Sequence, residues 1–352
     1  MRVLHLPSNI ASQISILVNA LCDLGIEARG LVRNNSVIQD IKNVEAITVL
    51  PRRQYPLRST WQILHWWYAV RSALQWADVV HWHFQDRALP WNLDLKYIKW
   101  QRKPRFVTFW GSDIRVPEVA TADNPYLAEL LANPHSGYAL SYQSSRNTQS
   151  RFAHYGFQCF VPGPELGKSV LPELFPTPIH TEASVITSDF IPCYPDPERR
   201  KPVIVHMPSK LAVKGTDSVL AAIEQLKPHY DFEFRLIHNV PHTEAVSMMC
   251  DCDLMLDQFV IGSFGTAALE AMALGKPVVC YLTPSVVAQL PPDAPFINAN
   301  RDNLAKVLSS LLTDGSRRQE IGRQSRAYVE KYHDAHTIAQ QLINIYKNYE
   351  YS

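Results

Sequence analysis

Residues 257–279, DQFVIGSFGTAALEAMALGKPVV, join two short apolar runs through a glycine-containing loop and a helical segment. The runs at 254–256 and 277–281 have the length and apolar character of buried strands in a parallel sheet. Between them, residues 266–274 predict a short helix that Gly275 ends. The stretch therefore predicts a strand, a loop, a helix and a strand in succession, which is the repeating unit of an α/β fold.

The glycines of this stretch are informative because the chain has only 13 of them, about half of the average usage. Gly262 and Gly265 allow the backbone to approach a ligand closely, and the following helix would direct its free N–H groups and positive dipole end toward that ligand. Glu270 lies about one turn into the helix, so its carboxylate can reach back toward the same pocket and suits a ribose diol. A solvated or structural carboxylate is the alternative for Glu270.

A second loop, HMPSKLAVKGTD at 206–217, precedes a predicted helix at 218–226. Lys210 and Lys214 lie just before this helix, where cationic groups and exposed backbone N–H groups can hold an anion such as a diphosphate. A solvated basic turn is the alternative, and for the lysines alone it is the more common case. Ligands of open α/β sheets bind at the carboxyl ends of strands, which is where both loops fall.

The remainder of the chain shows the same alternation of strands and helices. Strands are predicted at 2–6, 28–32, 78–83 and 105–109 in the first half, and at 203–206, 233–237, 254–256 and 277–281 in the second. Prolines accumulate between 162 and 202, so the interdomain connection is expected there, with a boundary near 195. We therefore predict two doubly wound Rossmann-like domains, 1–195 (with a linker from about 165) and 196–334, followed by a final helix in 335–352.

Length and composition limit the possible function classes. The chain has 352 residues, enough for two domains, and its 46% hydrophobic and 19% charged residues exclude a disordered protein. Lys and Arg (34) balance Asp and Glu (33), so binding of nucleic acid through bulk charge is not expected. The absence of a signal-peptide pattern and of a long apolar run favours a cytoplasmic protein. Six scattered cysteines fit reduced thiols, so no disulfide is expected.

The two loops together resemble the donor domain of retaining glycosyltransferases of the family 4 type (glycosyl transferases group 1), which have the GT-B fold. The resemblance rests on Lys210-x3-Lys214-Gly215-Thr216 and on the glycine-helix stretch, and it covers residues 203–281. Weaker likenesses to the acceptor domain are DVVHWH at 78–83 and TFWGSDIR at 108–115. The resemblance implies two domains that face each other across a cleft, a nucleotide-sugar donor held mainly by the second domain, and a final helix that packs back on the first.

Residue by residue, the resemblance implies a donor site in the second domain. Lys210 and Lys214 would hold the diphosphate, and Glu270 would bind the ribose hydroxyls. Gly262 stands where the family has the first glutamate of a pair that contacts the donor sugar, so Asp257 or the backbone at 263–266 would replace it. The implied donor-binding residues are Asn9, Lys210, Lys214, Val240, Asp257, Gly262, Ser263, Phe264, Gly265, Thr266 and Glu270.

In the first domain the resemblance implies the residues on the acceptor side. His83 matches the second histidine of the family's His-x-His string and would position the donor sugar, and Trp110 stands where the family often has a histidine. The implied catalytic residues are His83, Lys214 and Asp113, and the implied acceptor-side residues are Trp110 and Arg115.

Three motifs could bind a metal by residue type, but the sequence argues against each. Asp251 and Asp253 form an Asp-x-Asp pair that leads directly into a predicted buried strand. The pair Cys250 and Cys252, like the histidines at 81 and 83, lacks the two further nearby ligands that a closed zinc site requires. Lysines and a helix dipole already neutralise a departing diphosphate, so we expect neither a metal nor another cofactor.

The predicted reaction is the transfer of a sugar from a UDP- or GDP-linked donor to an acceptor hydroxyl, with retention of anomeric configuration, in glycan or polysaccharide assembly. Because Gly262 replaces the first glutamate, two alternatives stay open. One is an inactive accessory or binding subunit of another transferase, and the other is a sugar-nucleotide epimerase of the same fold.

A basic and aromatic segment at 46–77 contains no acidic residue. It carries Arg52, Arg53, Arg58 and Arg71 interleaved with Tyr55, Trp61, Trp66, Trp67, Tyr68 and Trp76. Such a composition suits an interface with anionic headgroups, which predicts peripheral contact with the inner face of a membrane through 52–71 and a lipid-linked saccharide acceptor. A helix that packs its tryptophans into the core is the equal alternative, and single-stranded nucleic acid is a third.

Overall fold

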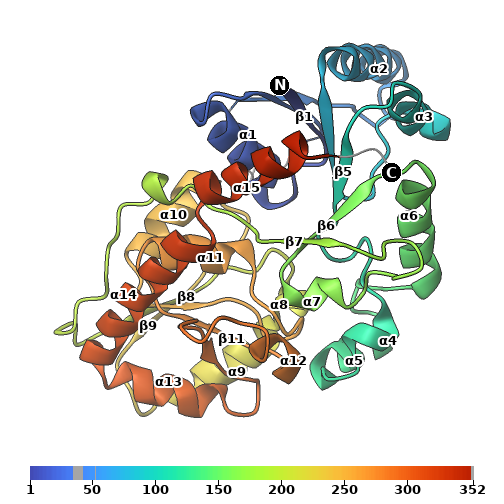
Figure 1. Ribbon diagram of the computed structural model, residues 1–352. Coiled ribbons are helices and arrows are strands. Elements are labelled where there is room, and N and C mark those ends of the chain that lie inside the picture. The colour runs from blue at the N-terminus through green and yellow to red at the C-terminus, as the bar shows by residue number, and fades with distance from the viewer. Residues whose placement is uncertain (35–42, 52, 350–352) are drawn as a thin grey trace. The chain divides into compact units, whose positions relative to one another are not determined.

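The computed structural model describes residues 1–34, 43–51 and 53–349, and it divides into two compact units (Figure 1). Unit 1 contains residues 1–116, 141–184 and the segment from 335 onward, and unit 2 contains residues 117–140 and 185–334. Each unit has a parallel sheet, of seven strands in unit 1 and of five strands in unit 2 within the described residues. The predicted α/β class with two Rossmann-like domains is therefore confirmed.

The sheet of unit 1 has the strand order β3-β2-β1-β4-β5-β6-β7, so the chain changes direction across the sheet between β1 and β4. The strands are β1 (Arg2–Pro7), β2 (Glu27–Arg33), β3 (Val44–Ile47), β4 (Val79–His83), β5 (Arg105–Thr108), β6 (Gln158–Pro162) and β7 (Ile179–Thr181). The helices are η1 (Ile10–Ser12), α1 (Gln13–Asp23), α2 (Pro56–Trp76), η2 (Pro90–Asn92), α3 (Leu93–Trp100), α6 (Tyr142–His154), α7 (Pro164–Gly167) and α15 (Ala335–Lys347). Loops that follow β1 and β4 are the expected ligand-binding positions of such a sheet.

The sheet of unit 2 has the order β12-β11-β10-β8-β9, with the change of direction between β10 and β8. Its strands are β8 (Val203–His206), β9 (Glu233–Leu236), β10 (Leu254–Leu256), β11 (Val278–Cys280) and β12 (Ile297–Asn298). Its helices are α4 (Pro117–Ala120), α5 (Pro125–Ala132), η3 (Thr187–Asp189), α8 (Leu211–Lys214), α9 (Thr216–Leu226), α10 (His242–Cys250), α11 (Thr266–Ala273), α12 (Pro284–Val287), α13 (Leu304–Leu312) and α14 (Gly315–Tyr332). The loops after β8 and β10 are the two loops that the sequence singles out.

The central strands are buried because helices cover both faces of each sheet. All five residues of β4 are buried, as are all four residues of β8 and all three of β10. This explains why the strands are continuous apolar runs rather than alternating patterns. The core of unit 1 contains the large side chains Trp66, Trp82, Phe109 and Phe152.

The chain crosses between the units at points that differ from the predicted boundary near 195. Residues 185–195 belong to unit 2, where the Val185 N–H donates to the carbonyl of His333 (2.9 Å). Residues 117–140, which the sequence assigns to the first domain, also belong to unit 2. The Asn124 amide donates to the carbonyls of Val260 and Ile261 (2.9 Å each), so α5 is attached to a loop that follows it by well over a hundred residues.

Helix α15 is part of unit 1, where it packs along α1 (Figure 1). Its buried residues recur at helical spacing and include Ile338, Ala339, Leu342 and Tyr346. The C-terminal helix thus buries its apolar stripe in the unit that also contains the N-terminus.

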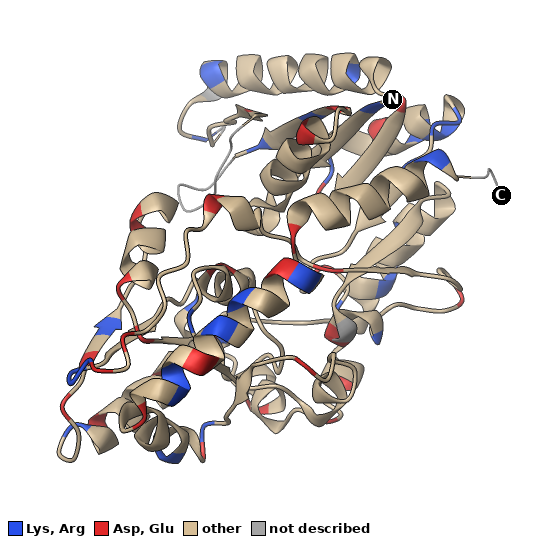
Figure 2. Cartoon of the chain, turned by 60° about the vertical axis from the view of Figure 1, so that its left-hand side comes forward, with Lys and Arg blue, Asp and Glu red and all other residues tan. Residues whose placement is uncertain are grey.

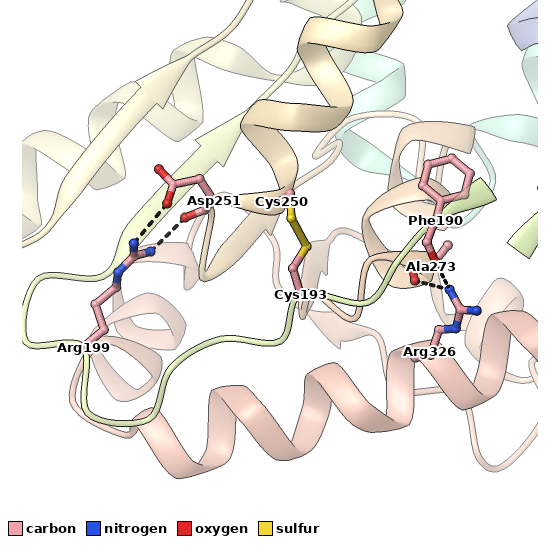
Figure 3. Close-up of a disulfide and its surroundings, with 7 residues drawn as sticks. All are labelled: Phe190, Cys193, Arg199, Cys250, Asp251, Ala273 and Arg326. Atoms are coloured by element: carbon pink, nitrogen blue, oxygen red, sulfur yellow. Dashed lines mark hydrogen bonds and ion pairs between the residues drawn. A yellow bond between two sulfur atoms is a disulfide. The ribbon is translucent and has the colours of Figure 1, made fainter. Parts of the chain in front are cut away.

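One disulfide joins Cys193 to Cys250 within unit 2 (Figure 3). It corrects the expectation that the cysteines are all reduced. The two cysteines are 57 residues apart in sequence, but the connecting segment passes the end of α11, where the Cys193 N–H donates to the Leu274 carbonyl (2.9 Å). That path brings Cys193 to the last residue of α10, a proximity that residue spacing could not indicate.

Helix α2 has two different faces. Trp66, Val70 and Leu74 are buried in the core of unit 1, and the Trp66 indole N–H donates to the Ala88 carbonyl (2.7 Å). The opposite face is an exposed stripe that we call the α2 stripe, formed by Leu57, Trp61, Leu64 and Tyr68. Core packing therefore accounts for one face of the aromatic segment and leaves the other in contact with solvent; Arg52 lies outside the described residues.

Candidate functional site

The two glycine-containing loops of unit 2 are joined by an ion pair. Lys214 ends α8, and its Nζ lies 2.6 Å from Asp257 Oδ1, directly after β10. The other carboxylate oxygen of Asp257 accepts a hydrogen bond from the Gly265 N–H (2.6 Å) at the start of α11. Asp257 is buried and the Lys214 side chain is 12% exposed, so the ammonium is held in place with donors left for a further acceptor.

Gly265 lacks a side chain at the point where Lys214 approaches. A Cβ there would lie 2.8 Å from Lys214 Nζ and 3.3 Å from Asp257 Oδ1, so any other residue would displace the ammonium. The glycine therefore makes room for the lysine, in addition to the close approach of a ligand that the sequence predicts.

Glu270 lies on α11 and faces α10. Its Oε1 is 2.9 Å from His242 Nε2, and the two side chains are 14% and 28% exposed. His242 begins α10 directly after Val240 and Pro241, and sequence reasoning does not identify it as a site residue. The available signal was its position after a strand, at the start of a helix in the same half of the chain.

Gly262 has a packing role within unit 2. Its φ is +83°, and a Cβ would lie 2.4 Å from Thr283 Cγ2 and 2.8 Å from Asn124 Nδ2. The Asn124 side chain caps α5 and donates to the carbonyls just before Gly262. A glutamate at 262 would therefore require this loop to be rebuilt.

The other implied donor residues occupy varied environments. Lys210 is exposed at the N-terminus of α8, and Thr266 begins α11. The Ser263 carbonyl accepts from the Gln258 amide (2.6 Å), while the Phe264 ring stacks on Phe296 at 4.4 Å between centroids. Their donor-binding roles, like those of the other implied site residues, stay predictions.

In unit 1, His83 lies at the end of β4 within a chain of hydrogen bonds. Trp110 Nε1–H donates to His83 Nδ1 (3.3 Å), and His83 Nε2 is 2.9 Å from His5 Nδ1. Because Nδ1 accepts from an indole that can only donate, the His83 proton lies on Nε2 and is directed to His5. Burial lowers the pKa of His83 well below its usual value and that of His5 to about 3, so both rings are neutral.

The third histidine of this cluster is His81. The parallel register pairs His5 with His81, and the ligand atoms of His5, His81 and His83 all lie within 4.8 Å of one another. The sequence does not indicate this third histidine, and within the described residues the cluster still lacks the fourth ligand that a closed zinc site requires. Both nitrogens of His81 are already engaged, by Tyr346 Oη (2.5 Å) and Thr108 Oγ1 (2.6 Å), so the cluster is a hydrogen-bonded core rather than a set of free ligands.

Asp113 is buried in the loop after β5. Its carboxylate accepts from the backbone N–H groups of Trp110 (3.1 Å) and Gly111 (2.8 Å). Burial raises its pKa to about 6 in spite of these hydrogen bonds. Asp113 therefore fixes the loop that places Trp110 beside His83, where the two rings stack at 6.0 Å and 12°.

Two further implied residues are engaged in holding unit 1 together. Asn9 Oδ1 accepts from the N–H groups of Ile14 (2.9 Å) and Ser15 (3.3 Å) and thereby caps α1. Arg115 forms a two-pronged ion pair with Glu165 (2.8 Å for both contacts) in largely buried surroundings. Their implied roles in donor binding and on the acceptor side stay predictions.

The Asp-x-Asp pair is held by arginines. Arg199 contacts Asp251 (3.0 Å) and Asp253 (2.9 Å), as Figure 3 shows for Asp251, and Arg235 contacts Asp251 (2.7 Å). The neighbouring Cys250 is bonded to another cysteine, so the Cys-x-Cys pair offers no pair of thiolates. These contacts give both motifs a structural role.

Comparison with known proteins places part of unit 2 near a known family. Residues 232–328, which include Asp257, Gly265 and Glu270, match the family described as Glycosyl transferases group 1. The predicted resemblance to group 1 glycosyltransferases is thereby confirmed for this part of unit 2. No curated protein sequence matches the chain.

Solved structures show a likeness over the whole chain. One is sucrose-phosphate synthase from Thermosynechococcus elongatus, with a TM-score of 0.68 and 12% identity over 99% of this chain and 98% of that chain. WaaG, a glycosyltransferase involved in lipopolysaccharide biosynthesis, has a TM-score of 0.59 and 13% identity over 99% and 100%. Anabaena HepE in complex with UDP and glucose has a TM-score of 0.60 and 14% identity over 99% and 100%. At these identities the likeness shows the fold, which is GT-B.

Proposed function

We propose that this protein is a retaining glycosyltransferase that moves a sugar from a nucleotide diphosphate sugar to an acceptor hydroxyl. The observation that carries the proposal is the joined pair of loops in unit 2, where Lys214, Asp257 and the first N–H groups of α11 meet at the carboxyl ends of β8 and β10. A cation beside a helix N-terminus is a site for a diphosphate.

The donor would be bound by groups whose geometry is already fixed. Lys214 has N–H donors beyond the one directed at Asp257, and a diphosphate would accept from them and from the start of α11. Glu270, oriented by His242, would accept from the ribose hydroxyls. HepE has been solved with UDP and with UDP-glucose, which supports a uridine nucleotide, with guanosine as the other candidate.

The chemical step would use the departing diphosphate itself. The bond between the anomeric carbon and the diphosphate oxygen breaks as the acceptor oxygen attacks from the same face. The leaving diphosphate takes the acceptor proton. Lysine charge and helix N–H groups stabilise the negative charge that develops on the leaving group, and such preorganised electrostatic stabilisation is usually the largest protein contribution. We propose that transfer needs no divalent metal.

We propose an acceptor attached to a membrane, reached through the α2 stripe. The stripe exposes Trp61 (66%) and Tyr68 (71%), and Figure 2 shows α2, the long helix at the top, with basic residues near both ends and no acidic residue. Aromatic rings flanked by arginines suit an anionic bilayer surface. None of the helices within the described ranges combines the length and apolar character needed to cross a bilayer.

Liposome sedimentation tests the membrane contact. Wild type should sediment with anionic liposomes and not with neutral ones, and Trp61→Ser with Tyr68→Ser should abolish the difference. Trp100→Ser, which alters an equally exposed tryptophan of unit 1 outside α2, is the matched control. Equal, negligible binding of wild type to both liposomes would refute the contact.

Nucleotide binding and turnover test the proposed reaction. A thermal-shift panel of UDP, GDP, ADP and CMP compounds should single out one nucleotide, since a ligand at 100 times its Kd adds about 2.7 kcal/mol of stability. Nucleotide release from the corresponding sugar donor should then depend on a saccharide acceptor. Binding without turnover would indicate an accessory subunit, and acceptor-independent release with a changed sugar would indicate an epimerase.

A further inference from the structure

A pocket of about 910 Å³ opens on unit 1 beside the carboxyl end of β4. Its wall is formed by the segment from Gln85 to η2, by α2 and by α6, with Arg33 at the end of β2. The sheet changes direction between β1 and β4, so the pocket lies at the edge where α/β sheets bind ligands. Its volume is typical of small-molecule sites.

The pocket is lined by three guanidinium groups, those of Arg33, Arg87 and Arg151, and by one carboxylate, that of Asp86. The Ser8 hydroxyl donates to Asp86. Arg33 and Arg87 are exposed and form no ion pair with any residue that the structure describes. The pocket therefore offers surplus positive charge to a ligand.

Two polar atoms in the wall are buried and lack a hydrogen-bond partner among the described residues, namely Arg151 Nε and Asn92 Oδ1. Arg151 Nη2 donates to the Gln85 carbonyl, which fixes the guanidinium while its Nε–H has no acceptor. Both atoms are closed to solvent, so the groups that a ligand meets in the pocket include the exposed Arg33 and Arg87 side chains.

Charge repulsion within the wall also favours an anion. Burial and, next, the charge of Arg87 lower the pKa of Arg151, while the carboxylates of Asp94 and Asp86 raise it. A bound anion between the two guanidinium groups would offset this repulsion, and guanidinium groups bind phosphate through paired hydrogen bonds. Several guanidinium groups suit a phosphate, with its greater charge and three oxygens, better than a single carboxylate.

Helix α2 supplies an apolar part of the wall. Ile63 and Trp67 of α2 line the pocket, and the Trp67 side chain is 39% exposed. The flat indole of Trp67 lines the same pocket as the polar and cationic side chains. This mixture of aromatic and polar groups is typical of small-molecule sites.

We propose that this pocket binds a phosphate-bearing saccharide, with the phosphate on Arg33, Arg87 and Arg151 and the sugar ring between Trp67 and Asn92. This rests on the proposed function, because the phosphosaccharide would serve as the acceptor of the transfer. The phosphate belongs either to a soluble sugar phosphate or to the phosphate that links a saccharide to a lipid.

Calorimetric binding to the full-length protein tests the pocket. The probes are hexose phosphates, the same neutral hexoses, glucuronic acid and inorganic phosphate. At least one hexose phosphate should bind ten or more times more tightly than its neutral counterpart, glucuronic acid and inorganic phosphate. Its affinity should fall as salt is raised. Equal affinities for phosphorylated and neutral sugars, or equal affinities for a hexose phosphate and inorganic phosphate, would overturn the proposal.

Substitutions in and outside the pocket test where the hexose phosphate binds. The double variant Arg33→Gln with Arg87→Gln should bind the hexose phosphate at least ten times more weakly, because both side chains line the pocket. Both are exposed, so their loss does not disturb the core. Arg146→Gln on α6, an exposed arginine outside the pocket, is the matched control and should bind like wild type. Unchanged affinity in the double variant would place the site elsewhere and refute the assignment.

The two sources of phosphate are separated by adding vesicles that carry a polyprenyl-phosphate saccharide and vesicles that carry the unglycosylated anionic lipid. Stronger competition by the former than by the latter assigns the pocket to a lipid-linked saccharide, while competition by soluble hexose phosphate alone assigns it to a free sugar phosphate. Nucleotide binding is measured in parallel on the same samples. If nucleotide binds and no phosphosaccharide does, the pocket assignment fails and the donor site stands; the reverse result refutes the proposed function alone.

Discussion

The two units have the same architecture but opposite chemistry at the carboxyl ends of their central strands. In unit 2, the Asp257 carboxylate directly after β10 is paired with the Lys214 ammonium, and the partly exposed side chains of His242 and Glu270 are in contact. In unit 1, the central strands β1 and β4 carry neutral, fully buried imidazoles, among them His5 and His83, and the charged groups of the pocket lie outside these strands, at the end of β2 and after β4. A charged, accessible edge suits a ligand that brings its own negative charge, whereas neutral, buried imidazoles hold neighbouring side chains in place through hydrogen bonds.

The largest expected effect comes from removing the charged edge of unit 2. Replacing Lys214 alone would leave the buried Asp257 carboxylate without its cationic partner, which is costly in itself. The double change Lys214→Met with Asp257→Asn avoids this, and Glu270→Gln keeps a hydrogen bond to His242. Each should lower turnover with donor and acceptor by about a hundredfold or more, as loss of one preorganised electrostatic group does.

Steady-state kinetics checks this, with circular dichroism to confirm the fold. Lys227→Met, which removes an exposed lysine of unit 2, is the matched control and should retain full activity. A loss of less than about tenfold, equivalent to about 1.4 kcal/mol, would show that the joined loops are not the donor site.

The contrast between the units also explains what the sequence could predict. Lys214, Gly265 and Glu270 can be identified because they lie in loops and a helix whose spacing is read directly along the chain. His5 was missed because it meets His81 only through the parallel register of β1 with β4. A side chain whose surroundings come from a distant strand leaves no signal in its own segment.

The same reasoning applies to Asn124 and Arg115, whose contacts come from distant parts of the chain. Asn124 lies in the segment 117–140 that belongs to unit 2, and it donates to the loop before Gly262. Arg115 forms an ion pair with Glu165, fifty residues later in the chain. The sequence could identify the α/β class and the two glycine-containing loops of unit 2, because hydrophobic runs and glycine positions are local. Unit boundaries, ion pairs and the disulfide depend on long-range packing, which a single sequence does not display.

The disulfide allows the stabilities of the two units to be compared, because within the described residues only unit 2 has one. Cys193→Ser should lower the free energy of unfolding of unit 2 by about 2–4 kcal/mol, since the bond closes a long loop in the unfolded chain. Differential scanning calorimetry should show one transition lowered and the other unchanged. Cys22→Ser, an exposed thiol in unit 1, is the control, and equal transition temperatures for wild type and Cys193→Ser would contradict the prediction.

A smaller effect is expected from the pH dependence of unit 1. Burial lowers the pKa of His5 from 6.5 to about 3 in the folded state, so the unfolded chain takes up a proton between these values and the folded chain does not. The contribution of His5 to the free energy of unfolding is complete above pH 6.5. It decreases as the pH falls, by up to about 1.4 kcal/mol per pH unit. His5→Asn keeps an acceptor for His83 and removes this titration.

The measurement is the slope of unfolding free energy against pH between 6 and 4. The slope should be smaller in His5→Asn than in wild type, while His65→Asn, which alters an exposed histidine on α2, should leave it unchanged. Because the comparison uses slopes, a general loss of stability in the variant does not affect it. Identical slopes in His5→Asn and wild type would mean that His5 takes up protons in the folded state.

The smallest expected effect is that of metal removal, which should leave transfer unchanged. In unit 2, Lys214 and the start of α11 are placed to neutralise a departing diphosphate, and the Asp251 and Asp253 carboxylates are paired with Arg199. In unit 1, both nitrogens of His81 are occupied by hydrogen bonds. A cation at either place would have to displace an existing partner. Assays with EDTA, followed by Mg²⁺ or Mn²⁺ addition, should therefore give constant rates; a strict and reversible requirement for either ion would assign the developing charge to a metal instead of to Lys214 and the start of α11.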